Sequence, residues 1–177
     1  MYDLTFLLLQ AESAESDTTS FTVTLVDDDP FFKETMRDYL TSMNIKKIEM
    51  YESGEKFLEV FKEGDNRLVV LDYDFGPLSK YDGMGVLEEI RKRDKNIPVI
   101  MLSAQDNMAI SLETLRRGAL DYFIKGNQST YTSVLASILK INELQRLKRS
   151  QREYMLTGIV GGAIFAILVW LAYAKYF

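Results

Sequence analysis

The sequence predicts a doubly wound α/β domain built on a five-stranded parallel sheet, followed by a single apolar helix. Two observations predict the domain: short apolar runs alternate with amphipathic stretches, and charged or hydroxyl residues follow several of these runs directly. Strands that alternate with helices along a chain are typical of parallel sheets. A third observation, an uncharged stretch at 156–174, predicts the apolar helix.

Composition places the chain among globular proteins and limits its chemistry. Its 177 residues are 47% hydrophobic and 27% charged, and the net charge is -5 at pH 7. Because there is no basic surplus to neutralise phosphates, we expect no nucleic-acid partner. The chain has no cysteine and no histidine, which excludes disulfides, thiolate chemistry and phosphohistidine on this chain. Carboxylates, hydroxyls, lysines and a hard cation remain as the chemical inventory.

Four segments are expected from the changes of composition along the chain. The first twenty residues lack the basic start and long apolar core of a secretory signal. The segments are a flexible N-terminal arm at 1–20, the α/β domain at 21–143, a basic juxtamembrane helix at 144–155 and a transmembrane helix at 156–174.

Within the α/β domain, apolar runs predict five strands and amphipathic stretches predict five helices. Pro30 suits a first helical turn, Ser53 is a plausible cap, and Gly118 ends a helix. The expected strands are 21–26, 46–51, 67–72, 97–103 and 120–125. The expected helices are 30–40, 53–63, 84–93, 107–118 and a long one that begins near 129.

Acidic residues stand at the ends of two predicted strands. Asp27 and Asp28 follow the first strand directly, and Asp72 ends the third. In the flavodoxin-like order 2-1-3-4-5 these strands are neighbours at the point where the order reverses, which is where sites form in such sheets. Three converging carboxylates repel one another unless a cation binds or their pKa values rise. The donor types favour Mg²⁺.

Two further strand ends supply groups for phosphoryl transfer. The fourth strand ends in Ser103, followed by the small Ala104, and the fifth ends in Lys125. Taken alone, Ser103 is more often a helix cap and Lys125 a solvated charge. Together with the acids they suit a reaction in which Asp72 attacks in line. Mg²⁺ and Lys125 then neutralise the phosphoryl oxygens while Ser103 donates a hydrogen bond.

These motifs resemble the receiver domain of two-component response regulators over residues 21–143. The resemblance implies that Asp72 accepts a phosphoryl group from a histidine kinase or a histidine phosphotransfer protein. It further implies a Mg²⁺ site formed by Asp27, Asp28, Asp72 and the main-chain carbonyl of Asp74. The motifs that carry the resemblance are "VTLVDDDPFFKETMRDYL", "RLVVLDYD", "DGMGVLEEIRK", "IPVIMLSA" and "GALDYFIKG".

The same resemblance assigns the contacts and the switch. Ser103, Ala104 and Lys125 are expected to contact the phosphoryl group, and Tyr122 is expected to repack as the Ser103 hydroxyl moves. Such a protein is a phosphoacceptor, not an enzyme beyond Mg²⁺-dependent self-phosphorylation and autodephosphorylation. The chain departs from the family's usual pattern in a longer "YDFGPLSKY" loop, in the side-chain charge of Asp74, and in Gly126 where proline is usual.

Two other functions fit part of the pattern. A haloacid-dehalogenase-type phosphatase also uses an Asp-x-Asp strand, here "LDYDF", with a downstream Ser and Lys. In that family the nucleophile strand comes first and the acidic pair last, whereas Asp27 and Asp28 precede Asp72. The second alternative is a receiver-like membrane scaffold that is never phosphorylated. Fold alone does not exclude it.

The predicted transmembrane helix sets the expected location. Basic residues precede 156–174 and only Lys175 follows it. This bias predicts a single-pass protein with its N-terminus cytoplasmic, on the cytoplasmic face of a bacterial inner membrane. Gly158, Gly162 and Ala166 recur every four residues, which suits helix pairing in a homodimer, although glycine is common in membrane helices in general. The output is expected to be contact with an unidentified downstream protein.

Overall fold

The structure is a computed structural model that describes residues 18–126 and 128–176. Side chains at 128, 160, 163–169 and 171–176 also lie outside the described part. The predicted arm at 1–20 therefore falls mostly outside the described residues. Its last residues are held by the domain: the Thr18 N–H donates to the Asn44 carbonyl, and the Asn66 side chain donates to the Ser20 carbonyl.

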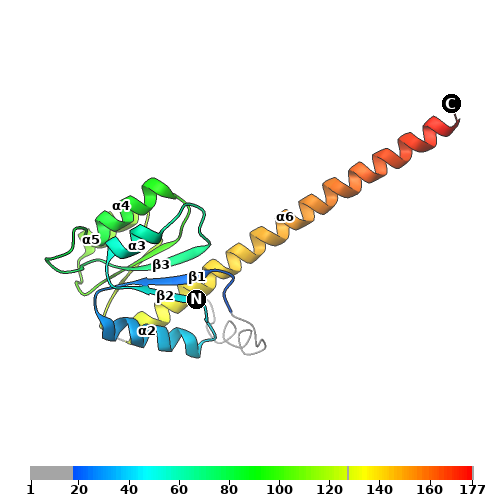
Figure 1. The fold of residues 1–177 in the computed structure, drawn as a ribbon. Helices are drawn as coiled ribbons and strands as arrows, with labels where there is room; N and C mark the ends of the chain where they lie inside the picture. The colour runs from blue at the N-terminus through cyan, green and yellow to red at the C-terminus, as the bar shows by residue number, and fades with distance from the viewer. Residues whose placement is uncertain (1–17, 127, 177) are drawn as a thin grey trace. The chain divides into compact units, whose positions relative to one another are not determined.

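Five strands form one parallel sheet, β1 (Thr22–Val26), β2 (Ile48–Tyr51), β3 (Arg67–Asp72), β4 (Val99–Ser103) and β5 (Asp121–Ile124). Their order is β2-β1-β3-β4-β5, which confirms the predicted order (Figure 1). The register pairs Val26 with Leu71 and Asp72 with Leu102. The ends of β1, β3 and β4 are therefore level at one edge of the sheet, where the predicted site residues stand.

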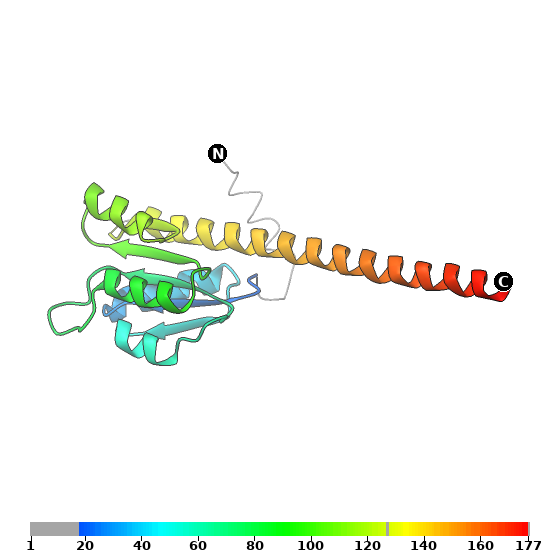
Figure 2. The same ribbon diagram turned by 90° about the horizontal axis from the view of Figure 1, so that it is seen from above.

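Helices cover both faces of this sheet, so its central strands are buried on two sides (Figures 1 and 2). On one face lie α2 (Pro30–Ser42) and the first turns of α6 (Gln128–Tyr176), where the Tyr131 ring packs 5.7 Å from the rings of both Phe32 and Tyr39. On the other face lie α3 (Gly54–Val60), α4 (Gly83–Arg93) and α5 (Met108–Arg116). The apolar cluster under α3 and α4 includes Phe57, Leu71, Phe75, Val86, Leu87, Ile90 and Met101.

Side-chain caps determine where several helices begin. The Asp29 carboxylate accepts from the N–H groups of Phe31 and Phe32 and so begins α2, while Asp82 begins α4 by accepting from Gly85. The prediction for α3 was too long. This helix ends at Val60 because Phe61 adopts an extended conformation and buries its ring in the core.

The chain divides into two units, the first ending at Lys140 and the second beginning at Ile141. Among the residues that the structure describes, no helix is long and apolar enough to cross a membrane. The predicted transmembrane helix at 156–174 is therefore not supported by the structure. Of the small residues predicted to pack there, Gly158 and Gly162 are exposed, and the side chain of Ala166 lies outside the described part.

A glycine fixes how closely α4 approaches the end of β3. The Gly83 N–H donates to the Tyr73 carbonyl at 2.8 Å, and a Cβ at Gly83 would overlap the Asp72 carbonyl oxygen. We predict that Gly83→Ala lowers the free energy of unfolding by about 2–3 kcal/mol, because rigid backbone atoms must move. Chemical denaturation measures the loss.

The matched control is Gly85→Ala in the same helix, where a Cβ would meet only side-chain atoms, the nearest being Tyr81 Cδ1 at 3.1 Å. Its loss should be clearly smaller. Equal losses for the two variants would contradict a special role for the close approach to Asp72, since helix propensity alone would make both substitutions stabilising.

Candidate functional site

Three carboxylates meet at the edge of the sheet where β1 and β3 end. Asp27, Asp28 and Asp72 each offer an oxygen, and these oxygens all lie within 4.8 Å of one another. Asp27 and Asp72 are only 3% and 5% exposed, whereas Asp28 is exposed. The parallel pairing of β1 with β3 produces this convergence, since both strands deliver their last residues to the same edge.

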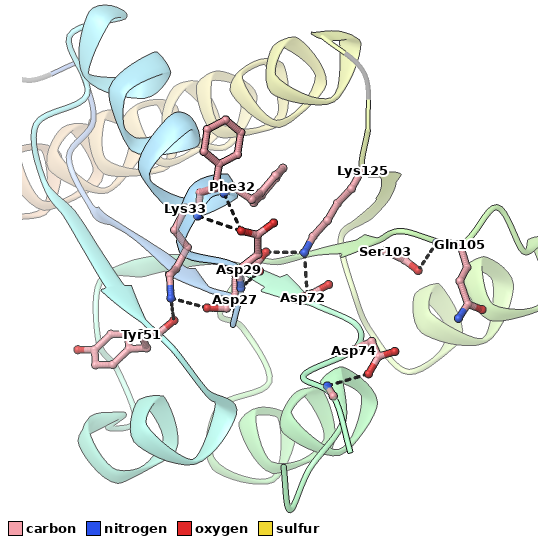
Figure 3. A network of polar contacts seen from close by, with 12 residues as sticks. Asp27, Asp29, Phe32, Lys33, Tyr51, Asp72, Asp74, Ser103, Gln105 and Lys125 are labelled. Carbon is pink, nitrogen blue, oxygen red and sulfur yellow. Dashed lines mark hydrogen bonds and ion pairs between the residues drawn. The ribbon is translucent and has the colours of Figure 1, made fainter. Parts of the chain in front are cut away.

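Lys125 bridges the two buried acids from the opposite side. Its Nζ lies 2.6 Å from Asp27 Oδ2 and 2.7 Å from Asp72 Oδ2 (Figure 3). Lys125 follows β5 directly, and its main-chain N–H donates to the Ser103 carbonyl at 2.7 Å, which continues the pairing of β5 with β4. The Phe32 ring lies 4.8 Å from the same Nζ, so the ammonium is also held by a cation–π contact.

Burial and mutual repulsion perturb the ionisation of this cluster. Burial raises the pKa of Asp72 to about 6, and the charge of Asp27 adds to the rise, against the Lys125 ammonium and a backbone hydrogen bond from Asp74. Burial likewise raises the pKa of Asp27, although Lys125 opposes it. For Lys125, burial alone would lower the pKa, but the two carboxylates outweigh it and raise the pKa. At neutral pH the site therefore holds an ionised but destabilised Asp72 carboxylate beside a firmly charged ammonium.

Asp27 is fixed by contacts that the sequence analysis did not identify. Its Oδ1 accepts from the Asp29 N–H at 2.9 Å. The ammonium of the buried Lys33 donates a hydrogen bond to the Asp27 carbonyl at 2.5 Å. The same Nζ lies 3.4 Å from the Tyr51 carbonyl oxygen. Lys33 thus ties the ends of β1 and β2 together beneath the cluster. In the sequence, the position of Lys33 next to the core-facing Phe32 of the predicted helix could have indicated that this lysine is buried.

The predicted switch residues gather around one backbone segment. The Ser103 hydroxyl is buried and accepts from the Gln105 N–H at 3.1 Å, while the Tyr122 hydroxyl donates to the Gln105 carbonyl at 3.0 Å. Ala104 between them is exposed. Ser103 and Tyr122 are therefore both hydrogen-bonded to the backbone of Gln105, which links the end of β4 to the Tyr122 side chain on β5.

The hydrogen bond of the Asp74 side chain is made within its own loop and not with the acidic cluster. Its Oδ1 accepts from the Gly76 N–H at 2.9 Å, which turns the carboxylate into the loop between β3 and α4 (Figure 3). Gly76 has a φ of 74°, a conformation that glycine adopts without strain. The role of the Asp74 main-chain carbonyl as a metal ligand stays a prediction.

The donor set fits a hard divalent cation. All three acids offer oxygen, and Asp27 Oδ2 is buried without a well-directed hydrogen bond, even though the Lys125 ammonium lies close to it. Exposed Asp28 leaves one side of the cluster open to solvent. Mg²⁺ suits such a site, because this small ion gives up its bound waters reluctantly, keeps several of them and needs few carboxylates.

Comparison with known proteins agrees with this arrangement. Residues 23–134 match the response regulator receiver domain family. The match covers more than half of the chain, and the chain belongs to this family.

Individual relatives match over a similar stretch. The chain is 36% identical over 105 residues to the probable C4-dicarboxylate response regulator DctR of Bacillus subtilis, a stretch that covers 58% of this chain but only 45% of that protein. It is 27% identical over 107 residues to the chemotaxis protein CheY of the same organism, covering 60% of this chain and 87% of CheY. Among solved structures, the receiver domain of NtrX from Brucella abortus superposes with a TM-score of 0.59 at 25% identity, covering 67% of this chain and 98% of that one.

The raised pKa of Asp72 makes a prediction for stability. Its folded-state pKa of about 6 lies above the ordinary 3.8, so the folded state favours the protonated carboxyl. The stability that this protonation contributes is fully present below about pH 3.8 and is lost as pH rises through about 6. In metal-free buffer at pH 7.5, Asp72→Asn should raise the free energy of unfolding by about 1–3 kcal/mol. Below about pH 4 the gain should vanish, because the wild-type carboxyl is then protonated in both states.

Urea denaturation over this pH range measures the effect, with exposed Asp106→Asn as the control. The control should track the wild type throughout. A gain at pH 7.5 that persists unchanged at pH 4 would contradict an electrostatic origin.

Proposed function

We propose that this chain is a phosphoacceptor that takes a phosphoryl group on Asp72 and signals through protein–protein contact. The observation that carries the proposal is the bridging of Asp27 and Asp72 by Lys125 in a buried cluster. A structural ion pair needs one carboxylate for one ammonium. Two buried acids at one lysine, with a third acid alongside, leave an excess of negative charge that suits a bound cation. That cation and Lys125 together would offset the charge of an incoming phosphoryl group.

In the proposed reaction an Asp72 carboxylate oxygen attacks phosphorus and an acyl phosphate bond forms. The bond from phosphorus to the donor's imidazole nitrogen breaks, and the nitrogen keeps the electron pair and takes up a proton. Lys125 would neutralise the negative charge that the phosphoryl oxygens bring into a buried site, and its ion pair with Asp72 supports this role. Because its ammonium already lies against Asp72, little reorganisation is needed.

Mg²⁺ is the proposed cofactor, held by Asp27, Asp28 and Asp72 with the Asp74 main-chain carbonyl as a further ligand. When bound, it would neutralise phosphoryl oxygens as a Lewis acid. The buried Asp27 oxygen without a directed hydrogen bond supports this assignment.

The proposed switch runs through Gln105. The phosphoryl group would draw the Ser103 hydroxyl away from the Gln105 N–H and toward a phosphoryl oxygen, beside Ala104. Tyr122, bonded to the carbonyl of the same residue, is placed to respond by repacking its half-buried ring. This arrangement couples the site to the exposed surface formed by α5 and β5.

The proposed donor is a histidine kinase or a histidine phosphotransfer protein, since the chain itself has no histidine. The downstream partner is proposed to be a protein. The expectation of no nucleic-acid partner has no support, because some matching relatives are named transcriptional regulators. The membership of the receiver family argues against a haloacid-dehalogenase-type phosphatase. A receiver-like scaffold that is never phosphorylated stays the competing function, and the labelling experiment below distinguishes it.

Membrane anchoring through 156–174 is the second part of the proposal. Its support is the sequence: the stretch carries no charge, and basic residues including Arg149 and Arg152 precede it. The anchor would place the N-terminal domain on the cytoplasmic face of a bacterial inner membrane. Pairing of two copies along Gly158, Gly162 and Ala166 is proposed with it.

Fractionation tests the anchor. The full chain, expressed in bacteria, should stay in the membrane pellet after extraction at alkaline pH and dissolve only in detergent, because such a stretch partitions into the hydrocarbon core. A chain that ends at residue 155 should be found in the supernatant. Release of the full chain by alkaline extraction would contradict the anchor and leave the phosphoacceptor proposal untouched.

Phosphorylation is tested by labelling with radioactive acetyl phosphate. The wild type should acquire an acid-stable, base-labile label that depends on Mg²⁺, and Asp72→Asn should abolish it because the nucleophile is gone. Lys125→Met should reduce labelling by at least about tenfold, which corresponds to about 1.4 kcal/mol in the barrier.

The control is Asp74→Asn, because the amide oxygen still accepts from Gly76 and the substitution leaves the cluster intact. This variant should remain labelled. A folded wild type that takes no label with Mg²⁺ present would favour the scaffold, and labelling that survives Asp72→Asn would move the acceptor to another residue.

A further inference from the structure

The loop between β3 and α4, residues 73–82, is anchored from a helix that does not adjoin it in sequence. Glu55, in the first turn of α3, accepts from the main-chain N–H groups of Lys80 and Tyr81 at 2.6 and 3.2 Å. The Ser79 hydroxyl lies 3.1 Å from the same Oε1 atom. Three donors from consecutive residues thus converge on one carboxylate. The Leu78 side chain just before them is fully exposed, so little apolar burial holds the tip of the loop.

The ionisation of Glu55 suits a permanent anchor. Partial burial alone would raise its pKa, but hydrogen bonds from backbone N–H groups and from the Ser53 and Ser79 hydroxyls outweigh burial and hold the pKa below its ordinary value. The carboxylate is therefore charged throughout the neutral range, and its hydrogen bonds are charge-assisted.

The same loop reaches the acidic cluster at its other end. The Ser79 N–H donates to the Gly76 carbonyl, and the Gly76 N–H donates to Asp74 Oδ1. A Cβ built at Gly76 would lie 3.8 Å from Asp28 Oδ2. A continuous run of hydrogen bonds therefore leads from Glu55 through the loop to the residues beside the predicted metal ligands.

We propose that Glu55 is a positioning residue that holds the 73–82 loop against the acidic cluster and thereby strengthens Mg²⁺ binding. Asp74 contributes its main-chain carbonyl to the proposed metal site, so a loop released at Ser79–Tyr81 lets that carbonyl and the neighbouring Gly76 move relative to Asp28. The inference rests on the proposed function for the identity of the cation. It adds a residue on a separate helix that contacts neither the cation nor the phosphoryl group.

The hydrogen bonds of Glu55 to Ser79, Lys80 and Tyr81 are called the Glu55 clamp below. Two measurements on the metal-free full chain test it. Calorimetric titration gives the Kd for Mg²⁺, and amide hydrogen exchange gives the mobility of residues 76–82. Glu55→Ala should raise the Kd about tenfold, as loss of outer-shell support does at other metal sites, and should speed exchange in the loop. Glu55→Gln keeps an oxygen acceptor and should fall between Glu55→Ala and the wild type.

Two controls separate the clamp from a general charge effect. Glu59→Ala removes the same charge from an exposed position of the same helix and should leave both readouts unchanged. Ser79→Ala changes no charge, loses one donor to Glu55, and should shift both readouts in the direction of Glu55→Ala.

The outcomes are distinct. Faster loop exchange with an unchanged Kd in Glu55→Ala would make Glu55 a structural anchor only and overturn the proposal, as would a Kd that rises equally in Glu59→Ala. If the wild type binds Mg²⁺ and the clamp variants behave as expected but Asp72 takes no label, the clamp stands and the phosphoacceptor function fails.

Discussion

The ammonium of Lys125 between two buried carboxylates is the interaction on which the rest of the site depends. Two acids from neighbouring strands would repel each other in a low-dielectric environment, and the bridge at 2.6 and 2.7 Å makes their burial tolerable. The bridge does not remove the penalty, since burial still raises the pKa of Asp72 to about 6. The site is therefore held in a state that an added cation or a change at Asp72 would relieve.

The supporting contacts make sense as ways of keeping this strained cluster in place. Lys33 fixes the backbone of Asp27 from below, and the close approach of Gly83 holds the backbone at Asp72. On the open side, the Glu55 clamp holds the loop that borders Asp28. Each support comes from a different helix, so the site is positioned by the packed domain as a whole rather than by one loop.

Much of the site could be predicted from the sequence, because the order of the strands determines which residues at the strand ends lie close together. Once β1 and β3 were predicted as neighbours, Asp27, Asp28 and Asp72 had to converge. Lys125 follows β5 at the same edge of the sheet, but β4 separates β5 from β3, so its contacts depend on the reach of its long side chain. The Glu55 contacts were not predictable, since they depend on the three-dimensional path of the loop at 73–82. The orientation of the Asp74 side chain, which accepts from the Gly76 N–H, also depends on the path of this loop. The end of α3 was mispredicted because burial of Phe61 outweighed a helical pattern that continued to residue 63.

The central claim, that Asp72 is destabilised by burial and ready for a cation, is tested most directly by its own titration. Carboxyl-carbon NMR of the aspartates, assigned with the Asp72→Asn variant, gives the apparent pKa in metal-free buffer and with Mg²⁺. The account predicts an apparent pKa of about 6 that falls when Mg²⁺ is added, because a bound cation favours the ionised form. A titration near the ordinary value of 3.8 that Mg²⁺ leaves unchanged would contradict it.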